Sequence, residues 1–236
     1  MSRIKNPLVD PLLSVVMPVF NEKATIDEII RRTLAVPVRV QLIVVDDCST
    51  DGTRDMLTTL QRELGFTLIL QAQNAGKGSA LRRGFQEVCG DLVIIQDADL
   101  EYSPEEFPEL IHLICDGRAD VVFGSRFLGK HRVFMFTHYM GNRFLTMATN
   151  ILYNTMLTDM ETCYKVMRTE VLRSMTLEAN GFGIEPELTA KIFKRGYRVY
   201  EVPISYDGRS YEEGKKIGWR DGFVALWVLL KFRFTE

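Results

Sequence analysis

The sequence predicts an α/β domain built on a mostly parallel sheet with helices on both faces. Two observations support this prediction. Short apolar runs alternate with amphipathic segments through the first half of the chain, and carboxylates follow directly after two of those runs. Such alternation is typical of parallel sheets, in which a helix crosses back over the sheet between strands. At 236 residues, the chain is expected to form a single domain with its own core.

The apolar runs of the first half have the length and composition of buried strands. We expect strands at residues 13–17, 41–45, 66–70, 92–95 and 121–123. Between them, apolar residues recur every three or four positions, which predicts helices within 26–34, 57–64, 81–88 and 107–114.

The second half of the chain is less regular. A helix is expected at about 144–155, with Phe144 and Ile151 on its apolar side, and an added strand at 163–167. A second helix at 185–195 and an extended segment at 197–206 complete the expected elements.

Composition and charge restrict the kinds of function. The net charge of −2 lacks the basic excess of a nucleic-acid-binding protein, so no nucleic-acid partner is expected. The four cysteines are widely spaced without a CxxC pair, which favours a reducing compartment. The N-terminus lacks a signal-peptide pattern and no apolar run is long enough to span a bilayer. We therefore expect a cytoplasmic protein.

Carboxylates cluster where two strands are expected to end. Asp46 and Asp47 follow the second strand, and Asp97 and Asp99 follow the fourth. Ligands of parallel sheets bind beside the carboxyl ends of the strands, so both clusters are expected at the ligand-binding edge. Carboxylates gathered in one crevice repel one another unless a cation or a donor-rich ligand compensates. A D-x-D pair at this edge suits Mg²⁺ or Mn²⁺, whereas helix capping is the simpler alternative.

A glycine-rich segment, NAGKGS at 74–79, precedes the helix expected after the third strand. Such a segment at a helix N-terminus can hold an anion, and Lys77 adds positive charge. It fits neither a Walker A loop nor a dinucleotide fingerprint, because Gln71 and Leu81 stand where those patterns need glycine. An ordinary turn with a surface lysine is the alternative.

Taken together, these segments resemble one family. PVFNE at 18–22, VDDCSTDGT at 45–53, NAGKG at 74–78, DAD at 97–99 and GSR at 124–126 occur in the order found in family-2 glycosyltransferases. They are most similar to the branch with dolichol-phosphate mannosyltransferases and bacterial polyprenyl-phosphate glycosyltransferases. The resemblance implies a glycosyltransferase A-type fold. It also implies inverting transfer of a sugar from a nucleotide-diphosphate-sugar to a polyprenyl (dolichyl or undecaprenyl) phosphate.

The resemblance also implies roles for individual side chains. The donor would be bound by Pro18, Phe20, Glu22, Asp46 or Asp47, Lys77, Asp97, Arg209 and Lys215. The metal, Mg²⁺ or Mn²⁺, would be held by Asp97, Asp99 and Glu101, where Glu101 replaces a glutamine that is frequent in that branch. The lipid phosphate acceptor would be bound by Arg126, Arg143 and Thr146, and the catalytic candidates are Asp97, Arg126 and Glu161.

We expect the single domain to have three parts: a nucleotide-sugar-binding half at 1–126, an acceptor-side half at 127–218 and an amphipathic C-terminal helix at 219–236. In that helix, Trp219, Trp227, Lys231 and Arg233 surround an apolar stretch, as in helices that lie in a membrane interface. Peripheral membrane contact is therefore one expectation. Packing against the body of the protein and a contact within a homo-oligomer are the alternatives.

The sequence does not decide between two kinds of acceptor. A lipid phosphate is already anionic and needs positioning, whereas a sugar hydroxyl needs a general base. Glu161 is the candidate base, with pairing to Lys165 as the alternative, and Glu185 is expected to be an ordinary first-turn helix acid. A sugar nucleotidyltransferase is less favoured, because PVFNE lacks the arginine-bearing glycine-rich loop of that class. A non-catalytic nucleotide-sugar binder is disfavoured by the intact acidic and basic groups.

Overall fold

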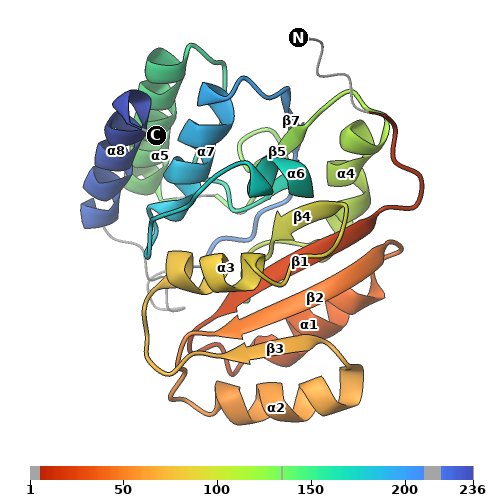
Figure 1. The fold of residues 1–236 in the computed structure, drawn as a ribbon. Helices are drawn as coiled ribbons and strands as arrows, with labels where there is room; N and C mark the ends of the chain where they lie inside the picture. The colour runs from red at the N-terminus through yellow and green to blue at the C-terminus, as the bar shows by residue number, and fades with distance from the viewer. Residues whose placement is uncertain (1–5, 134, 210–218, 236) are drawn as a thin grey trace.

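The computed structural model describes residues 6–133, 135–209 and 219–235, except the side chains of Trp219 and Arg220. Its centre is a seven-stranded sheet of order β3-β2-β1-β4-β6-β5-β7 (Figure 1). The strands are β1 (Leu12–Val19), β2 (Arg39–Asp46), β3 (Thr67–Leu70), β4 (Leu92–Ile95), β5 (Val121–Ser125), β6 (Lys165–Arg168) and β7 (Val199–Pro203). Among these strands, β6 alone is antiparallel to its neighbours, β4 and β5.

The first half follows the predicted alternation of strands and helices. Its connections contain α1 (Ile26–Ala35), α2 (Thr53–Leu64), α3 (Lys77–Phe85), the 3-10 turn η1 (Pro104–Glu106) and α4 (Phe107–Cys115). In Figure 1, α3 lies in front of the sheet and α1 behind it. Both faces are thus covered, and every residue from Leu13 to Met17 of β1 is buried. This double burial explains why the strands are continuous apolar runs, and the predicted α/β class is confirmed.

The second half departs from the predicted boundaries. The added strand is β6, which lies between β4 and β5 inside the sheet. The helix predicted at 144–155 is α5 (Phe136–Tyr153), which begins earlier and is followed by Asn154 in the left-handed conformation (φ 51°). The remaining helices are α6 (Thr169–Arg173), α7 (Ile184–Lys194) and α8 (Trp219–Phe234).

Helices α5, α7 and α8 stand together beside one end of the sheet (Figure 1). Helix α8 packs on the body through Ala225, Val228, Leu229 and Phe232, which are all buried. The predicted apolar side of α5 is not its buried side, because Ile151 is 74% exposed and Phe144 is 53% exposed. None of the helices in the described ranges combines the length and hydropathy needed to cross a bilayer.

Candidate active site

A cavity of about 900 Å³ lies where β1, β2 and β4 end, which is the edge at which the sequence predicts ligand binding. One wall is polar and comes from the strand ends and the start of α3. The opposite wall comes from α5 and α8 and includes Phe144, Leu145, Phe223 and Leu226. The predicted site residues that line the cavity are Pro18, Phe20, Glu22, Asp47, Lys77, Asp97, Asp99, Glu101, Arg126, Glu161 and Arg209.

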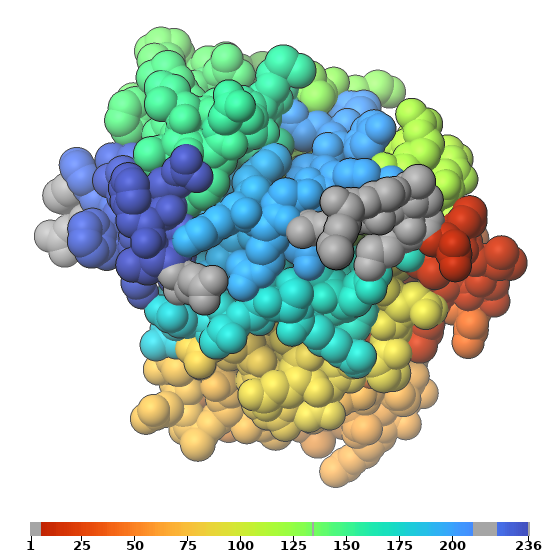
Figure 2. Space-filling view, turned by 45° about the horizontal axis from the view of Figure 1, so that its top comes forward, coloured from red at the N-terminus to blue at the C-terminus, as the bar shows by residue number. Residues whose placement is uncertain are grey.

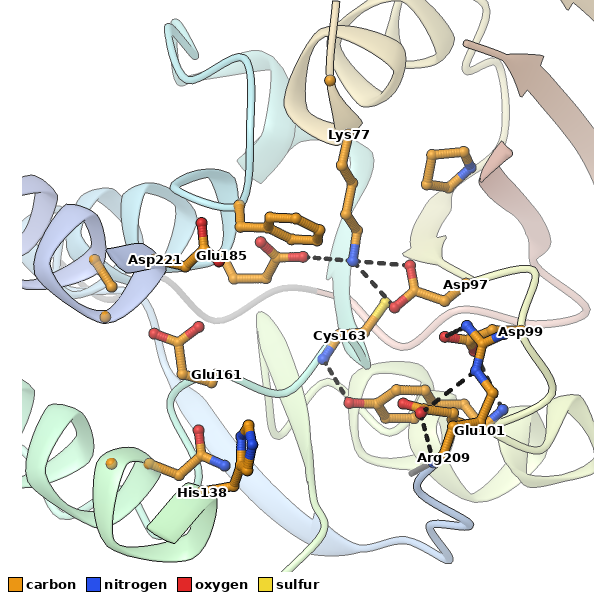
Figure 3. Close-up of a pocket in the computed structure, with 18 of the residues that line it drawn as sticks. Lys77, Asp97, Asp99, Glu101, His138, Glu161, Cys163, Glu185, Arg209 and Asp221 are labelled. Carbon is orange, nitrogen blue, oxygen red and sulfur yellow. Dashed lines mark hydrogen bonds and ion pairs between the residues drawn. The ribbon is translucent and has the colours of Figure 1, made fainter. Parts of the chain in front are cut away.

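Lys77 links two carboxylates that come from different parts of the chain. Its Nζ lies 2.8 Å from Asp97 Oδ1 and 2.7 Å from Glu185 Oε1 (Figure 3). Burial alone would lower the pKa of Lys77, but the two carboxylates outweigh it and hold that pKa well above its usual value. Glu185 belongs to the first turn of α7, as predicted, yet its side chain is buried and faces the cavity.

Arg209 lies among three other carboxylates. Its Nη2 is 3.0 Å from Asp99 Oδ2, and its backbone N–H donates to Glu101 Oε1 at 2.7 Å (Figure 3). Its Nη1 is 3.2 Å from Glu22 Oε2. Tyr206 donates its hydroxyl to the other oxygen of Glu101 at 2.6 Å. Burial and the nearby charges of Asp97 and Glu101 raise the pKa of Asp99 to about 7.

The three predicted metal ligands, Asp97, Asp99 and Glu101, line the same cavity. Within the described residues, no group of three or more acidic, His or Cys side chains is gathered as a ready metal site. Asp97 and Asp99 instead face the cationic groups of Lys77 and Arg209. The donor set nevertheless fits a hard divalent ion, because it offers carboxylate oxygens and already attracts a positive group.

Asp46 and Asp47 have different surroundings, although they are adjacent in the sequence. Asp46 is fully buried, pairs with Arg54 at 2.7 Å and does not line the cavity. Asp47 does line the cavity, and its carboxylate accepts the backbone N–H groups of Ala75 (2.9 Å) and Gly76 (2.8 Å). Of the two alternatives left open by the sequence, the geometry favours Asp47.

The glycine-rich loop therefore holds an anion from within the protein, the carboxylate of Asp47. Gly76 has φ 92°, a conformation that side chains other than glycine rarely adopt. A Cβ at Gly78 would collide with the carbonyl of Ala179, so this loop packs directly on the chain before α7. The alternative of a turn with a surface lysine does not describe Lys77, whose ammonium group is directed into the cavity (Figure 3).

Arg126 is engaged with Asp159, a buried carboxylate. The guanidinium Nε and Nη2 lie 2.7 Å from the two oxygens of Asp159, and the backbone N–H of Arg126 donates to the same group at 3.0 Å. The other two predicted acceptor residues do not line the cavity. Arg143 is exposed on α5, and Thr146 is buried, where its hydroxyl accepts the backbone N–H of Met160. Lys215 lies outside the described residues.

Glu161 faces the cavity without a hydrogen-bond partner for its Oε1 among the described residues. The alternative of pairing with Lys165 is not what the structure shows, since Lys165 donates to the backbone oxygens of Met160 and Thr162. Burial and the nearby charge of Glu185 raise the pKa of Glu161 to about 7. A carboxyl group with that pKa can give or take a proton at neutral pH.

Known structures define the class of protein. The fold is similar to glucosyl-3-phosphoglycerate synthase from Mycobacterium tuberculosis, solved with Mg²⁺ and uridine diphosphate, with a TM-score of 0.73 and 25% identity. That match covers 94% of this chain and 79% of the other. A complex of the same enzyme with Mn²⁺, UDP-glucose and phosphoglyceric acid gives a TM-score of 0.74 at 24% identity, covering 94% and 80% of the two chains. The fold is that of the glycosyltransferase A class.

Sequence comparison gives the family. Residues 14–176 match the model of glycosyl transferase family 2, and the chain belongs to that family. It is 30% identical over 212 residues to dolichol-phosphate mannosyltransferase of Pyrococcus furiosus, covering 87% of this chain and 59% of that protein. It is 29% identical over 221 residues to the low-salt glycan biosynthesis hexosyltransferase Agl6 of Haloferax volcanii, covering 90% and 52%.

A third relative shares a shorter segment. The undecaprenyl-phosphate 4-deoxy-4-formamido-L-arabinose transferase of Serratia proteamaculans is 41% identical over 122 residues, which cover 48% of this chain and 37% of that protein. The chain thus spans between about a third and three fifths of the length of these curated relatives.

Proposed function

We propose that this protein is an inverting, metal-dependent hexosyltransferase that moves a sugar from a nucleotide-diphosphate-sugar to a polyprenyl phosphate. The observation that carries the proposal is the two-sided cavity. Lys77, Asp97, Asp99 and Arg209 form a charged wall suited to a nucleoside diphosphate. The wall from α5 and α8 is mixed: Phe144, Leu145, Phe223 and Leu226 give it an apolar part suited to an isoprenoid chain, and Thr137, His138, Asn142 and Asp221 are polar. The relatives named for dolichol phosphate and undecaprenyl phosphate support the same acceptor.

The proposed reaction is one in-line displacement at the anomeric carbon. An oxygen of the acceptor phosphate forms the new bond as the bond to the diphosphate breaks, and the departing diphosphate takes the electron pair. Lys77 and Arg209 are the cavity cations that would stabilise this developing charge. A divalent ion held by Asp99 and Glu101 would supply further positive charge when bound.

The proposal is tested by incubating the protein with labelled UDP-glucose, GDP-mannose and related donors, each with undecaprenyl phosphate and Mn²⁺ or Mg²⁺. We expect label to enter the lipid phase with one donor and to be lost when EDTA removes the metal. Lipid labelling that persists in EDTA would refute the metal dependence. Nucleotide release without lipid label would refute the polyprenyl acceptor.

Glu161 supports a second candidate, transfer to a hydroxyl group. A hydroxyl acceptor needs a base, and Glu161 is a partly buried carboxyl beside the cavity whose Oε1 has no hydrogen-bond partner among the described residues. Phosphoglyceric acid is a suitable soluble probe, because the structural neighbour was solved with it. Label that stays in the aqueous phase on such an acceptor would favour this candidate.

We also infer that α5 and α8 dock on an anionic lipid surface. Their surfaces adjoin in Figure 2, where α5 is green and α8 is dark blue. The exposed apolar side chains on these two helices are Phe136, Tyr139, Met140, Phe144, Met147, Ile151, Phe223, Val224, Trp227, Leu230 and Phe234. Residues 127–158 contain no acidic residue but include Lys130, Arg132 and Arg143. An apolar face with basic residues beside it complements an anionic bilayer.

The double variant Phe223→Ser with Trp227→Ser is expected to bind vesicles rich in phosphatidylglycerol at least about tenfold more weakly than the wild type. Co-sedimentation measures this binding, and Leu34→Ser on α1 is the matched control because it removes an exposed apolar side chain elsewhere. If the wild type ignores the vesicles and forms a dimer that the double variant loses, the face is a contact between two copies instead.

A further inference from the structure

The position of Arg209 suggests that it does more than bind the donor. Its guanidinium reaches Glu22 through Nη1 at 3.2 Å and Asp99 through Nη2 at 3.0 Å, while its Nε lies 3.7 Å from Glu101 Oε1. One positive group is thus shared by three carboxylates: Glu22 in the segment after β1, and Asp99 and Glu101 in the segment after β4. Without that group, they would repel one another in a largely buried site.

The carboxylate oxygens in this cluster are largely engaged with protein donors. Asp99 accepts the backbone N–H of Glu101 at one oxygen and Arg209 at the other. Glu101 accepts the backbone N–H of Arg209 and the Tyr206 hydroxyl. A divalent ion would therefore need the oxygen of Asp99 that Arg209 now holds, and two cations on the same oxygen would repel each other.

We propose that Arg209 is a built-in counter-ion that a divalent cation displaces from Glu22 and Asp99. The inference rests on the cation binding of the proposed function but not on its donor or acceptor. The guanidinium competes with the metal for the carboxylates, and once displaced it is available to an anionic ligand such as a diphosphate. The metal and the diphosphate then strengthen each other's binding. By thermodynamic reciprocity, the factor by which the diphosphate raises the metal affinity equals the factor by which the metal raises the diphosphate affinity.

Lys77 and Arg209 differ in a way that fits this exchange. Lys77 is 15% exposed and is held by Asp97 on one side and Glu185 on the other, from two separate elements. Arg209 is 21% exposed, and two of its three carboxylates, Asp99 and Glu101, are predicted metal ligands. A bound metal would thus neutralise two of the three carboxylates that Arg209 leaves, but only one, Asp97, of the two that Lys77 would leave.

The test measures Mn²⁺ affinity in the full chain without nucleotide, by the electron paramagnetic resonance signal of free Mn²⁺. Arg209→Gln removes the competing charge, so we expect it to bind Mn²⁺ about tenfold more tightly than the wild type. Arg32→Gln is the matched control, because Arg32 pairs with Glu105 at the surface and its loss should leave the affinity unchanged. Unchanged or weaker binding by Arg209→Gln would overturn the proposal.

Thermal unfolding gives a second readout that is independent of activity. Without metal, Arg209→Gln is expected to melt below the wild type, and saturating Mn²⁺ should close most of that gap because the metal replaces the lost charge. If Arg209→Gln does not fold, Arg209→Lys keeps the charge but loses the two-pronged contact, and is expected to bind Mn²⁺ more tightly than the wild type. A protein that transfers sugar normally but shows neither effect would overturn the counter-ion role and leave the proposed function intact.

Discussion

Replacing Arg126 with alanine is expected to lower the free energy of unfolding by about 3–5 kcal/mol, because it leaves a buried charge without its partner. Asp159 is fully buried and receives three hydrogen bonds from Arg126, two of them from the guanidinium. Alanine keeps only the backbone hydrogen bond. Urea denaturation at pH 7 measures the loss.

Two further variants separate burial of the charge from other effects. Arg32→Ala removes an arginine from a surface ion pair with Glu105 and should cost no more than about 1 kcal/mol. Adding Asp159→Asn to Arg126→Ala removes the uncompensated charge and should restore part of the stability. The contrary outcome is that Arg126→Ala unfolds at the same urea concentration as the wild type and fails to bind a phosphate acceptor. That result would show that the guanidinium binds the acceptor, as the family resemblance implies, and contributes little to stability through Asp159.

The first half of the fold was predictable because its signals are local. Continuous apolar runs and three-to-four-residue periodicity report burial within one element, and the strands and helices up to Val121 lie close to their predicted positions. Asp47, Asp97 and Asp99 lie together at the edge where β1, β2 and β4 end, as predicted, because the direction of parallel strands fixes which ends meet. Asp46 ends β2 at the same edge but does not line the cavity.

The second half was less predictable because its environment is set by distant segments. The sequence of β6 contains no sign that it enters the sheet between β4 and β5. The apolar side of α5 suggested burial, yet Phe144 and Ile151 are exposed. A hydrophobic pattern shows which side of a helix is apolar, but it does not show whether the rest of the protein covers that side.

The pairing of charges was the least predictable part of the site. Lys77 with Glu185, and Arg126 with Asp159, are pairs far apart in the sequence, and no local spacing connects them. The pairing of Asp46 with Arg54 had a local signal, because Arg54 lies in the first turn of the helix that follows the strand ending at Asp46. Such pairs decide whether a charged side chain is available to a ligand.

Glu161→Gln is expected to lower turnover by about 10²–10⁴-fold on a hydroxyl acceptor, because glutamine cannot accept the proton. The pKa of about 7 means that the base form of Glu161 increases through neutral pH, so kcat/KM for such an acceptor should rise with pH around that value in the wild type and not in the variant. Transfer to a polyprenyl phosphate needs no base and should survive the substitution. Measuring both acceptors with the same variant therefore distinguishes the two candidate functions.

The same substitution has a predictable effect on stability, whatever the acceptor. Burial and Glu185 raise the pKa of Glu161 from 4.5 to about 7, so the folded protein holds its proton more tightly than the unfolded chain does. Stability should therefore fall as pH rises from about 4.5 to 7, and Glu161→Gln should remove up to about 3 kcal/mol of that fall. Denaturation at pH 5 and pH 8 measures it, with Glu109→Gln at the surface of α4 as the control. A variant that gains no stability relative to the wild type between these pH values would show that Glu161 is well solvated in the cavity, and a solvated carboxylate of ordinary pKa would be a poor base at neutral pH.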